Sequence, residues 1–156
     1  MENHSKTDIQ KQSVHKVLAH SYSVYLILFL TGVFLDLIFN FKIFNIFFIV
    51  PMGIFFLAFG TGLIIWAQYT SLNLKVESVT KETFCKGPYC YTRTPTNFGL
   101  FFLMLGFGMI INAFFIILFA FISLVITKFI FLNKQEKILE EKYGTPYQEY
   151  KKSVKF

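Results

Sequence analysis

The chain consists of long apolar runs separated by short polar stretches. No Asp, Glu, Lys or Arg occurs from Val17 to Leu35, from Ile43 to Leu74 or from Thr94 to Thr127, which are runs of 19, 32 and 34 residues. A helix that crosses a bilayer needs about 20 mostly apolar residues. The pattern therefore predicts an all-α integral membrane protein that crosses the bilayer several times.

We expect about four transmembrane helices. The first is Tyr22–Phe41, and the second runs from about Ile43 to Gln68 with Pro51 near its outer end. The third apolar run is too long for one helix and has Asn112, a residue that favours turns, in its middle. We therefore expect a tight hairpin of two short spans, Phe98–Ile111 and Phe114–Leu132.

The distribution of basic residues predicts the orientation. Fourteen of the 15 lysines and arginines lie in the N-terminal tail, in the loop between the second and third spans, or in the C-terminal stretch from Lys128 onward, and Lys42 alone lies on the opposite side. Because Lys and Arg are enriched in cytoplasmic loops, both termini and the long loop should be cytoplasmic. The net charge of +6 then reflects orientation and attraction to anionic lipid, not nucleic acid.

These assignments describe one membrane domain, residues 1–156. Its parts are a cytoplasmic tail (1–20), the first two spans (21–70), a cytoplasmic loop (71–97), a helical hairpin (98–132), and a cytoplasmic C-terminal helix and tail (133–156). The polar N-terminal tail shows no pattern of a cleavable signal peptide. The excess of Lys over Arg and the abundance of Phe and Ile indicate an AT-rich genome, so we expect a bacterial inner membrane.

Composition narrows the class of protein further. Apolar residues make up 54% of the chain and charged residues 15%, against about 25% charged in soluble proteins, which excludes a disordered chain. Cys85 and Cys90 lie in the predicted cytoplasmic loop, where thiols stay reduced, so we expect free thiols. Two cysteines without further ligands nearby make a poor zinc site, and we expect no metal.

Glycines within the apolar runs suit close packing between helices in lipid. Such faces are also compatible with a homo-oligomer. The glycines concerned are Gly60, Gly62, Gly99, Gly106 and Gly108.

Asp36 is an acidic residue inside the first span. Ionisable residues within a membrane indicate function by default. The alternative is that Asp36 lies close enough to the outer interface to reach water or Asn40.

The loop 71–97 is the only sizeable polar segment outside the tails. Pro95 predicts that the third span begins at or after this residue, and a helix start suits an anionic group because it presents free N–H groups. The alternative is an interfacial loop in which Tyr89, Tyr91 and Arg93 anchor to lipid headgroups.

The segment after the fourth span predicts another helix. Asn133, with Glu136 three residues on, resembles an N-cap with its acidic partner, and Gly144 is a typical stop after Tyr143. Glu136 and Glu140 lie one turn apart on the same face. These two carboxylates either serve a ligand or are simply solvated.

Two segments together resemble a known family. Residues 87–99, G-P-Y-C-Y-T-R-T-P-T-N-F-G, are similar to the G-P-Y-R-Y-x-R-H-P-x-Y-x-G signature of the isoprenylcysteine carboxyl methyltransferase and phospholipid methyltransferase superfamily. After the hydrophobic hairpin, residues 136–150 resemble the family's E-E-x-x-L-x-x-x-F-G-x-x-Y-x-x-Y ending. The resemblance covers residues 86–154, nearly half of the chain.

The resemblance implies a membrane enzyme that binds S-adenosylmethionine in a cytoplasm-facing pocket. The methyl acceptor would be a lipid-soluble or membrane-delivered molecule: a lipid amine, a thiol or a prenylcysteine carboxylate. Arg93 would steer the carboxylate of the cofactor, Glu136 its amino group or ribose hydroxyls, and no residue stands out as catalytic. The implied cofactor-binding residues are Tyr91, Arg93, Thr94, Pro95, Asn97, Gly99, Glu136 and Glu140.

The chain departs from the family pattern at four positions. Thr94 replaces a His, Asn97 a Tyr and Gln135 the first Glu of the ending. Phe131 stands where carboxyl methyltransferases carry a substrate-handling Arg, which counts against methylation of a carboxylate. Three alternatives therefore stay open. They are an inactive family member that serves as a membrane partner or lipid-binding protein, a nicotinamide-dependent reductase with a similar C-terminal architecture, and a structural membrane protein.

Overall fold

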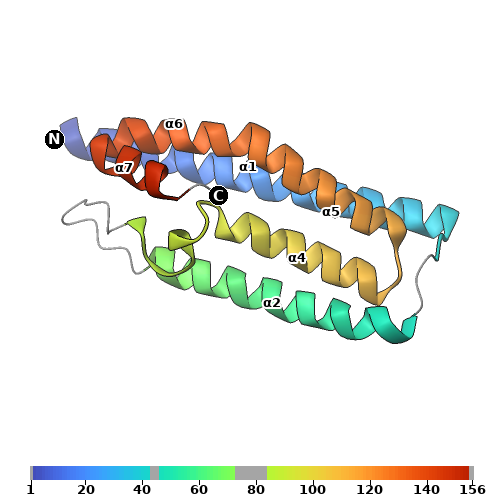
Figure 1. Cartoon of the computed structure of the whole chain (residues 1–156). Helices are drawn as coiled ribbons and strands as arrows, with labels where there is room; N and C mark the ends of the chain where they lie inside the picture. The colour runs from blue at the N-terminus through green and yellow to red at the C-terminus, as the bar shows by residue number, and fades with distance from the viewer. Residues whose placement is uncertain (1, 43–45, 73–83, 155–156) are drawn as a thin grey trace.

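The computed structural model describes residues 2–42, 46–72 and 84–154, and within these residues the chain is helical without strands (Figure 1). Three of its helices are long and apolar enough to cross a membrane: Ala19–Phe39, Phe47–Leu72 and Phe114–Glu141. The all-α fold is thus confirmed for the described residues, and the three apolar helices support a membrane protein with several spans. The elements are α1 (Glu2–Phe39), α2 (Ile46–Leu72), the 3-10 turn η1 (Gly87–Cys90), α4 (Pro95–Ile110), α5 (Phe114–Ile126), the π segment η2 (Thr127–Phe131), α6 (Leu132–Tyr143) and α7 (Thr145–Ser153).

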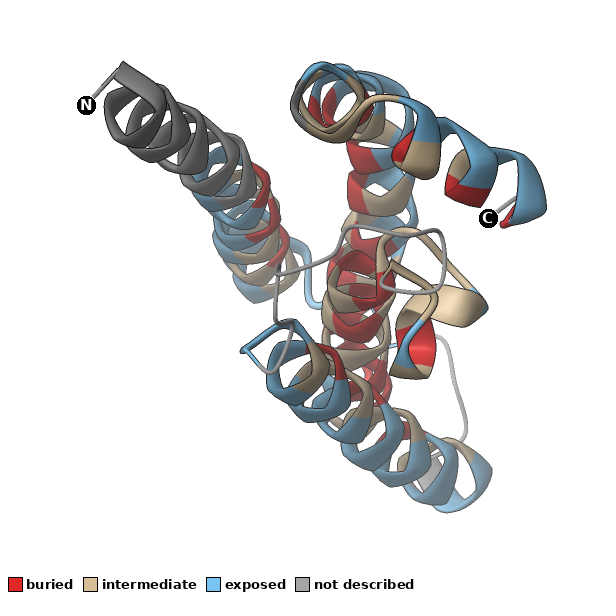
Figure 2. Ribbon diagram, turned by 90° about the vertical axis from the view of Figure 1, so that its left-hand side faces the viewer, coloured by how far each residue is buried: buried red, intermediate tan, exposed pale blue. Residues whose placement is uncertain are grey.

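Helices α4 and α5 form the middle of the molecule. Helix α2 packs along α4, α4 packs on α5, and α1 packs on α5 and α6. Figure 2 shows buried residues concentrated on the central helices, whereas α1 and α2 carry mostly exposed positions. Many of these exposed side chains are Phe, Leu and Ile, as expected for helix faces that meet lipid.

Two asparagines end helices at one end of the molecule. Asn40 has a φ of 46° directly after α1, and Asn112 has a φ of 56° in the turn between α4 and α5. Asparagine adopts this left-handed conformation more readily than most residues, which explains its place at both turns.

Asp36 ties α1 to the beginning of α5. Its two carboxylate oxygens accept hydrogen bonds from the backbone N–H groups of Phe115 and Ile116, each at 3.0 Å. These N–H groups belong to the first turn of α5, where no carbonyl of the same helix can serve them. The carboxylate of Asp36 therefore caps α5 instead of facing water or Asn40.

Glycines let α2 and α4 approach each other closely. A Cβ on Gly60 would lie 2.7 Å from the carbonyl oxygen of Gly99, and a Cβ on Gly53 would lie 2.8 Å from that of Gly106. The two glycine pairs are seven residues apart in each helix, so they lie on one face. Packing of this kind stabilises helix pairs in lipid, where burial of apolar surface between helices contributes little.

The glycine prediction holds for most positions but not for all. Gly108 lies against Ile116 of α5, whereas a Cβ on Gly62 would meet nothing within 4 Å. The prediction that Gly62 serves close packing is therefore wrong, because this residue lies on an open face of α2.

The predicted helix start at Asn133 is also wrong. Helix α5 continues through η2 into α6 without a break, since no Gly or Pro interrupts residues 114–143. The side-chain amide of Asn133 donates a hydrogen bond to the carbonyl oxygen of Phe129, one turn earlier, and so does not cap a new helix. The predicted end is correct, because α6 stops at Tyr143 and Gly144 has a φ of 60°.

The loop before α4 contains a disulfide bond between Cys85 and Cys90. The prediction of free thiols is therefore wrong. The bond closes a short loop that contains η1. The spacing of the two cysteines alone did not indicate that they pair.

Candidate functional site

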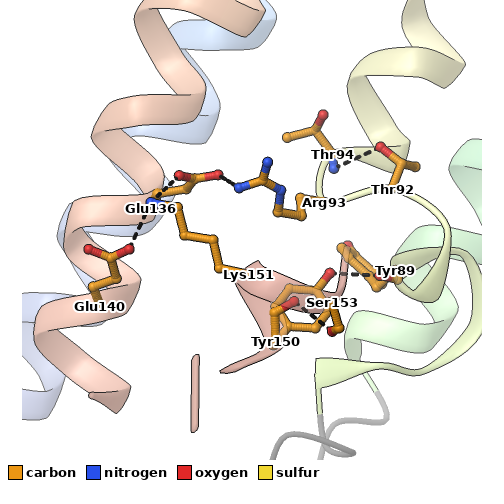
Figure 3. A network of polar contacts seen from close by, with 9 residues as sticks. All are labelled: Tyr89, Thr92, Arg93, Thr94, Glu136, Glu140, Tyr150, Lys151 and Ser153. Carbon is orange, nitrogen blue, oxygen red and sulfur yellow. Dashed lines mark hydrogen bonds and ion pairs between the residues drawn. The ribbon is translucent and has the colours of Figure 1, made fainter. Parts of the chain in front are cut away.

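The two segments that carry the family resemblance meet at one end of the helices. Figure 1 shows η1, the beginning of α4, and α7 at the same end. Polar side chains from these elements and from α6 converge there (Figure 3).

Arg93 and Glu136 form the centre of the site. The Nη1 atom of Arg93 pairs with Oε1 of Glu136, although the two residues are 43 positions apart in the sequence. Both side chains are largely buried, with exposed fractions of 14% for Arg93 and 6% for Glu136. Because a buried charge is costly without a partner, each residue stabilises the other in this position.

Lys151 of α7 adds a second cation. Its Nζ atom lies 2.7 Å from Oε2 of Glu136 and 2.8 Å from Oε1 of Glu140 (Figure 3). The hydrogen bond to Glu136, followed by the one to Glu140, raises the pKa of the Lys151 ammonium above its ordinary value of 10.5. The four side chains thus form a network in which cations and carboxylates alternate and the formal charges cancel.

Aromatic side chains fasten α7 to the loop. Tyr147, Tyr150 and Val154 are buried together, with Phe84 packed against them. The hydroxyl of Tyr150 donates a hydrogen bond of 2.7 Å to the carbonyl oxygen of Tyr89 in η1. Burial raises the pKa of Tyr150 to about 12, so its hydroxyl keeps the proton that it donates at neutral pH.

A cavity of about 30 Å³ lies beside this network, between α1, α4 and the π segment. This volume corresponds to one or two water molecules. Its lining surface is mostly apolar, although several of the lining residues carry a polar group: Tyr25, Thr94, Asn97, Thr127 and Lys128.

Buried polar contacts hold the wall of this cavity in place. The hydroxyl of Tyr25 donates to the backbone oxygen of Asn97 at 3.1 Å, and the hydroxyl of Ser21 donates to the side-chain oxygen of Asn97 at 3.3 Å. Thr127, the first residue of the π segment, donates to the carbonyl oxygen of Ser123 at 2.7 Å. Single π turns within α-helices occur frequently at functional sites.

The structure brings five of the eight sequence-predicted site residues to this region. Arg93, Glu136 and Glu140 belong to the ionic network. Thr94 and Asn97 lie at the cavity.

The other three residues lie elsewhere. Tyr91 is 78% exposed, and Pro95 is buried as the first residue of α4. Gly99 packs against Gly60 of α2, so its contact is with a neighbouring helix.

Three residues of the site were missed by the sequence analysis. Tyr25 and Thr127 are polar residues inside long apolar runs, which is a signal that could have found them. Lys151 follows the last tyrosine of the C-terminal motif, but one lysine among 14 carries no distinguishing pattern.

Comparison of this chain with protein-family models, with curated proteins and with solved structures finds no match. The resemblance to the methyltransferase superfamily therefore rests on the motif residues alone.

Proposed function

We propose that this protein is a membrane methyltransferase that uses S-adenosylmethionine and acts on a lipid-soluble or membrane-delivered acceptor. The observation that carries this proposal is the buried ion pair between Arg93 and Glu136. Each residue comes from one of the two segments that resemble the family, and the fold brings the segments together.

The charges at the site suit the amino-acid end of the cofactor. This end carries a carboxylate beside an ammonium, and the site offers a guanidinium beside carboxylates. Arg93 would bind the carboxylate in a charge-assisted pair, while Glu136 and Glu140 would bind the ammonium. When bound, the cofactor supplies a methyl group that its positively charged sulfur has already activated.

Three aromatic side chains are buried in the elements that form this end of the molecule. Tyr147 and Tyr150 belong to α7, and Phe131 ends the π segment. Exclusion of water and fixed positions of the reactants can supply much of the catalysis of a methyl transfer. Since Phe131 cannot hold a carboxylate, we favour a lipid amine or a thiol as the acceptor.

We further propose four membrane crossings with both termini in the cytoplasm of a bacterial cell. Arg93 precedes α4 and Glu136 follows α5, so their ion pair holds these two ends together. A chain that enters along α4 and returns along α5 must therefore cross twice or not at all. Helix α4 has 16 residues and is about 24 Å long, which is shorter than a typical hydrocarbon core but can be matched by local thinning.

Calorimetry on the detergent-purified protein tests the proposal. We expect saturable binding of S-adenosylmethionine and S-adenosylhomocysteine, but not of a nicotinamide dinucleotide. Glu136→Gln should abolish binding because it removes the buried carboxylate, whereas Glu141→Gln, on the exposed side of α6, should bind as the wild type does. Absence of binding in folded wild-type protein would overturn the proposal.

The second candidate is an inactive member of the same fold. The closed ionic network and the small cavity favour it, together with Thr94 and Phe131 in place of the family's His and Arg. Such a protein would bind lipid without binding the adenosyl ligands, so the same titration distinguishes the two functions.

A further inference from the structure

Both carboxylate oxygens of Glu136 are occupied by cations of the chain itself. Oε1 pairs with Arg93 and Oε2 with Lys151, and Lys151 also takes Oε1 of Glu140. The ammonium group of a ligand could reach Glu136 only by replacing one of these cations.

Lys151 is the cation that can leave at the lower cost. The side chain of Arg93 is only 14% exposed. Arg93 lies two residues before Pro95, where α4 begins, so its backbone is held by this helix. The side chain of Lys151 is 38% exposed and belongs to a helix of nine residues. An ammonium on a flexible stem returns to water more readily than a buried guanidinium.

The connection between α6 and α7 permits such a movement. The two helices meet at Gly144, which has a φ of 60°, and no atom lies within 4 Å of the place where a Cβ would stand. The contacts that hold α7 against the site include those of Lys151 with the two glutamates and that of Tyr150 with the carbonyl of Tyr89. The buried cluster of Tyr147, Tyr150 and Val154 with Phe84 must open with them when α7 moves.

We propose that Lys151 closes the site in an autoinhibitory contact: its ammonium occupies the position between Glu136 and Glu140 that the ammonium of an amino-acid ligand takes, and α7 moves away when this ligand binds. The inference rests on the proposed function, since S-adenosylmethionine is a ligand of this class.

The test compares the Lys151→Met variant with two controls. Lys151→Arg keeps the cation, and Lys152→Met removes the same charge from an exposed neighbour. Calorimetry measures the binding of S-adenosylhomocysteine and of 5′-methylthioadenosine, which lacks the amino-acid end. Because a closed fraction lowers apparent affinity in proportion, we expect Lys151→Met to bind S-adenosylhomocysteine about fivefold more tightly or better.

The controls separate the explanations. Lys152→Met should bind S-adenosylhomocysteine as the wild type does, Lys151→Arg should show no gain in affinity because it keeps the cation, and methylthioadenosine should gain nothing in any variant. Unchanged or weaker binding of S-adenosylhomocysteine by Lys151→Met, in the presence of wild-type binding, overturns the inference but leaves the proposed function intact. Absence of binding in the folded wild-type protein overturns the proposed function itself.

Hydrogen exchange on the wild-type protein needs no variant. Saturation with S-adenosylhomocysteine should speed the exchange of amides in residues 147–153, because α7 is released. Slower exchange there would show that the ligand tightens α7, and this result would overturn the inference.

Discussion

Asp36 shows how one side chain can fix two helices relative to each other. It serves two N–H groups at the start of α5, and it lies near the positive end of that helix. Asp36→Ala removes both hydrogen bonds and leaves the N–H groups without a partner in an apolar region. We expect it to lower the free energy of unfolding by about 2 kcal/mol, measured by denaturation in detergent.

Thr31→Ala is the matched control for this substitution. Thr31 lies on the same helix and is exposed, and its hydroxyl donates a hydrogen bond to the carbonyl of Ile27 one turn earlier. Its loss should change the free energy of unfolding by less than about 0.5 kcal/mol. Equal effects of the two substitutions would contradict the capping role of Asp36.

Because the pKa of Lys151 is raised in the folded protein, the free energy of unfolding should depend on pH. Its pKa is raised above 10.5 in the folded state, so its contribution is complete below that value and disappears as pH rises through the raised pKa. We expect the difference in melting temperature between wild type and Lys151→Met to stay constant from about pH 7 to pH 10 and to shrink above pH 11. A difference that disappears already between pH 7 and pH 9 would contradict the ionic network.

At the scale of the elements, the contact of α2 with α4 depends on glycine. Gly60→Ala places a methyl group 2.7 Å from the carbonyl oxygen of Gly99 and 2.9 Å from the backbone N of Leu103, so the helices must separate. We expect a loss of about 2 kcal/mol in the free energy of unfolding. Gly62→Ala, two residues on, meets nothing and should be neutral or slightly stabilising, and similar effects of both changes would contradict the packing.

The boundaries of elements were predictable where a local signal exists. Pro95 begins α4 because a proline fits the first turn of a helix, and Gly144 ends α6 because it adopts a positive φ. The N-cap pattern at Asn133 does not begin a helix, because the residues before it are already helical in η2 and α6 continues from them.

The parts that could not be predicted depend on contacts between distant residues. Asp36 lies 79 positions from Phe115, and no local pattern joins them. Helix α7 is only nine residues long, so its contacts with Phe84 and Tyr89 stabilise it more than its own helix propensity does. Arg93 and Glu136 were predicted from a resemblance, but their direct pairing follows only from the packing of α4 on α5.

At the scale of the whole molecule, charge and covalent structure give opposite indications about the loop before α4. Fourteen of 15 basic residues favour a cytoplasmic loop, whereas the disulfide between Cys85 and Cys90 is typical of an oxidising compartment. We give more weight to the charges. The enrichment of Lys and Arg in cytoplasmic loops bears on the orientation of every span, whereas the disulfide involves a single pair of cysteines.

Reporter fusions decide between these indications. Green fluorescent protein fused after Phe156 should fluoresce, and alkaline phosphatase fused there should be inactive, because both reporters would be in the cytoplasm. Alkaline phosphatase fused after Lys42 should be active, since this residue lies between α1 and α2 at the opposite end. Active phosphatase at both positions would mean an odd number of crossings. The ion pair between Arg93 and Glu136 would then have to form on a different side from the N-terminus, and the four-crossing arrangement would be wrong.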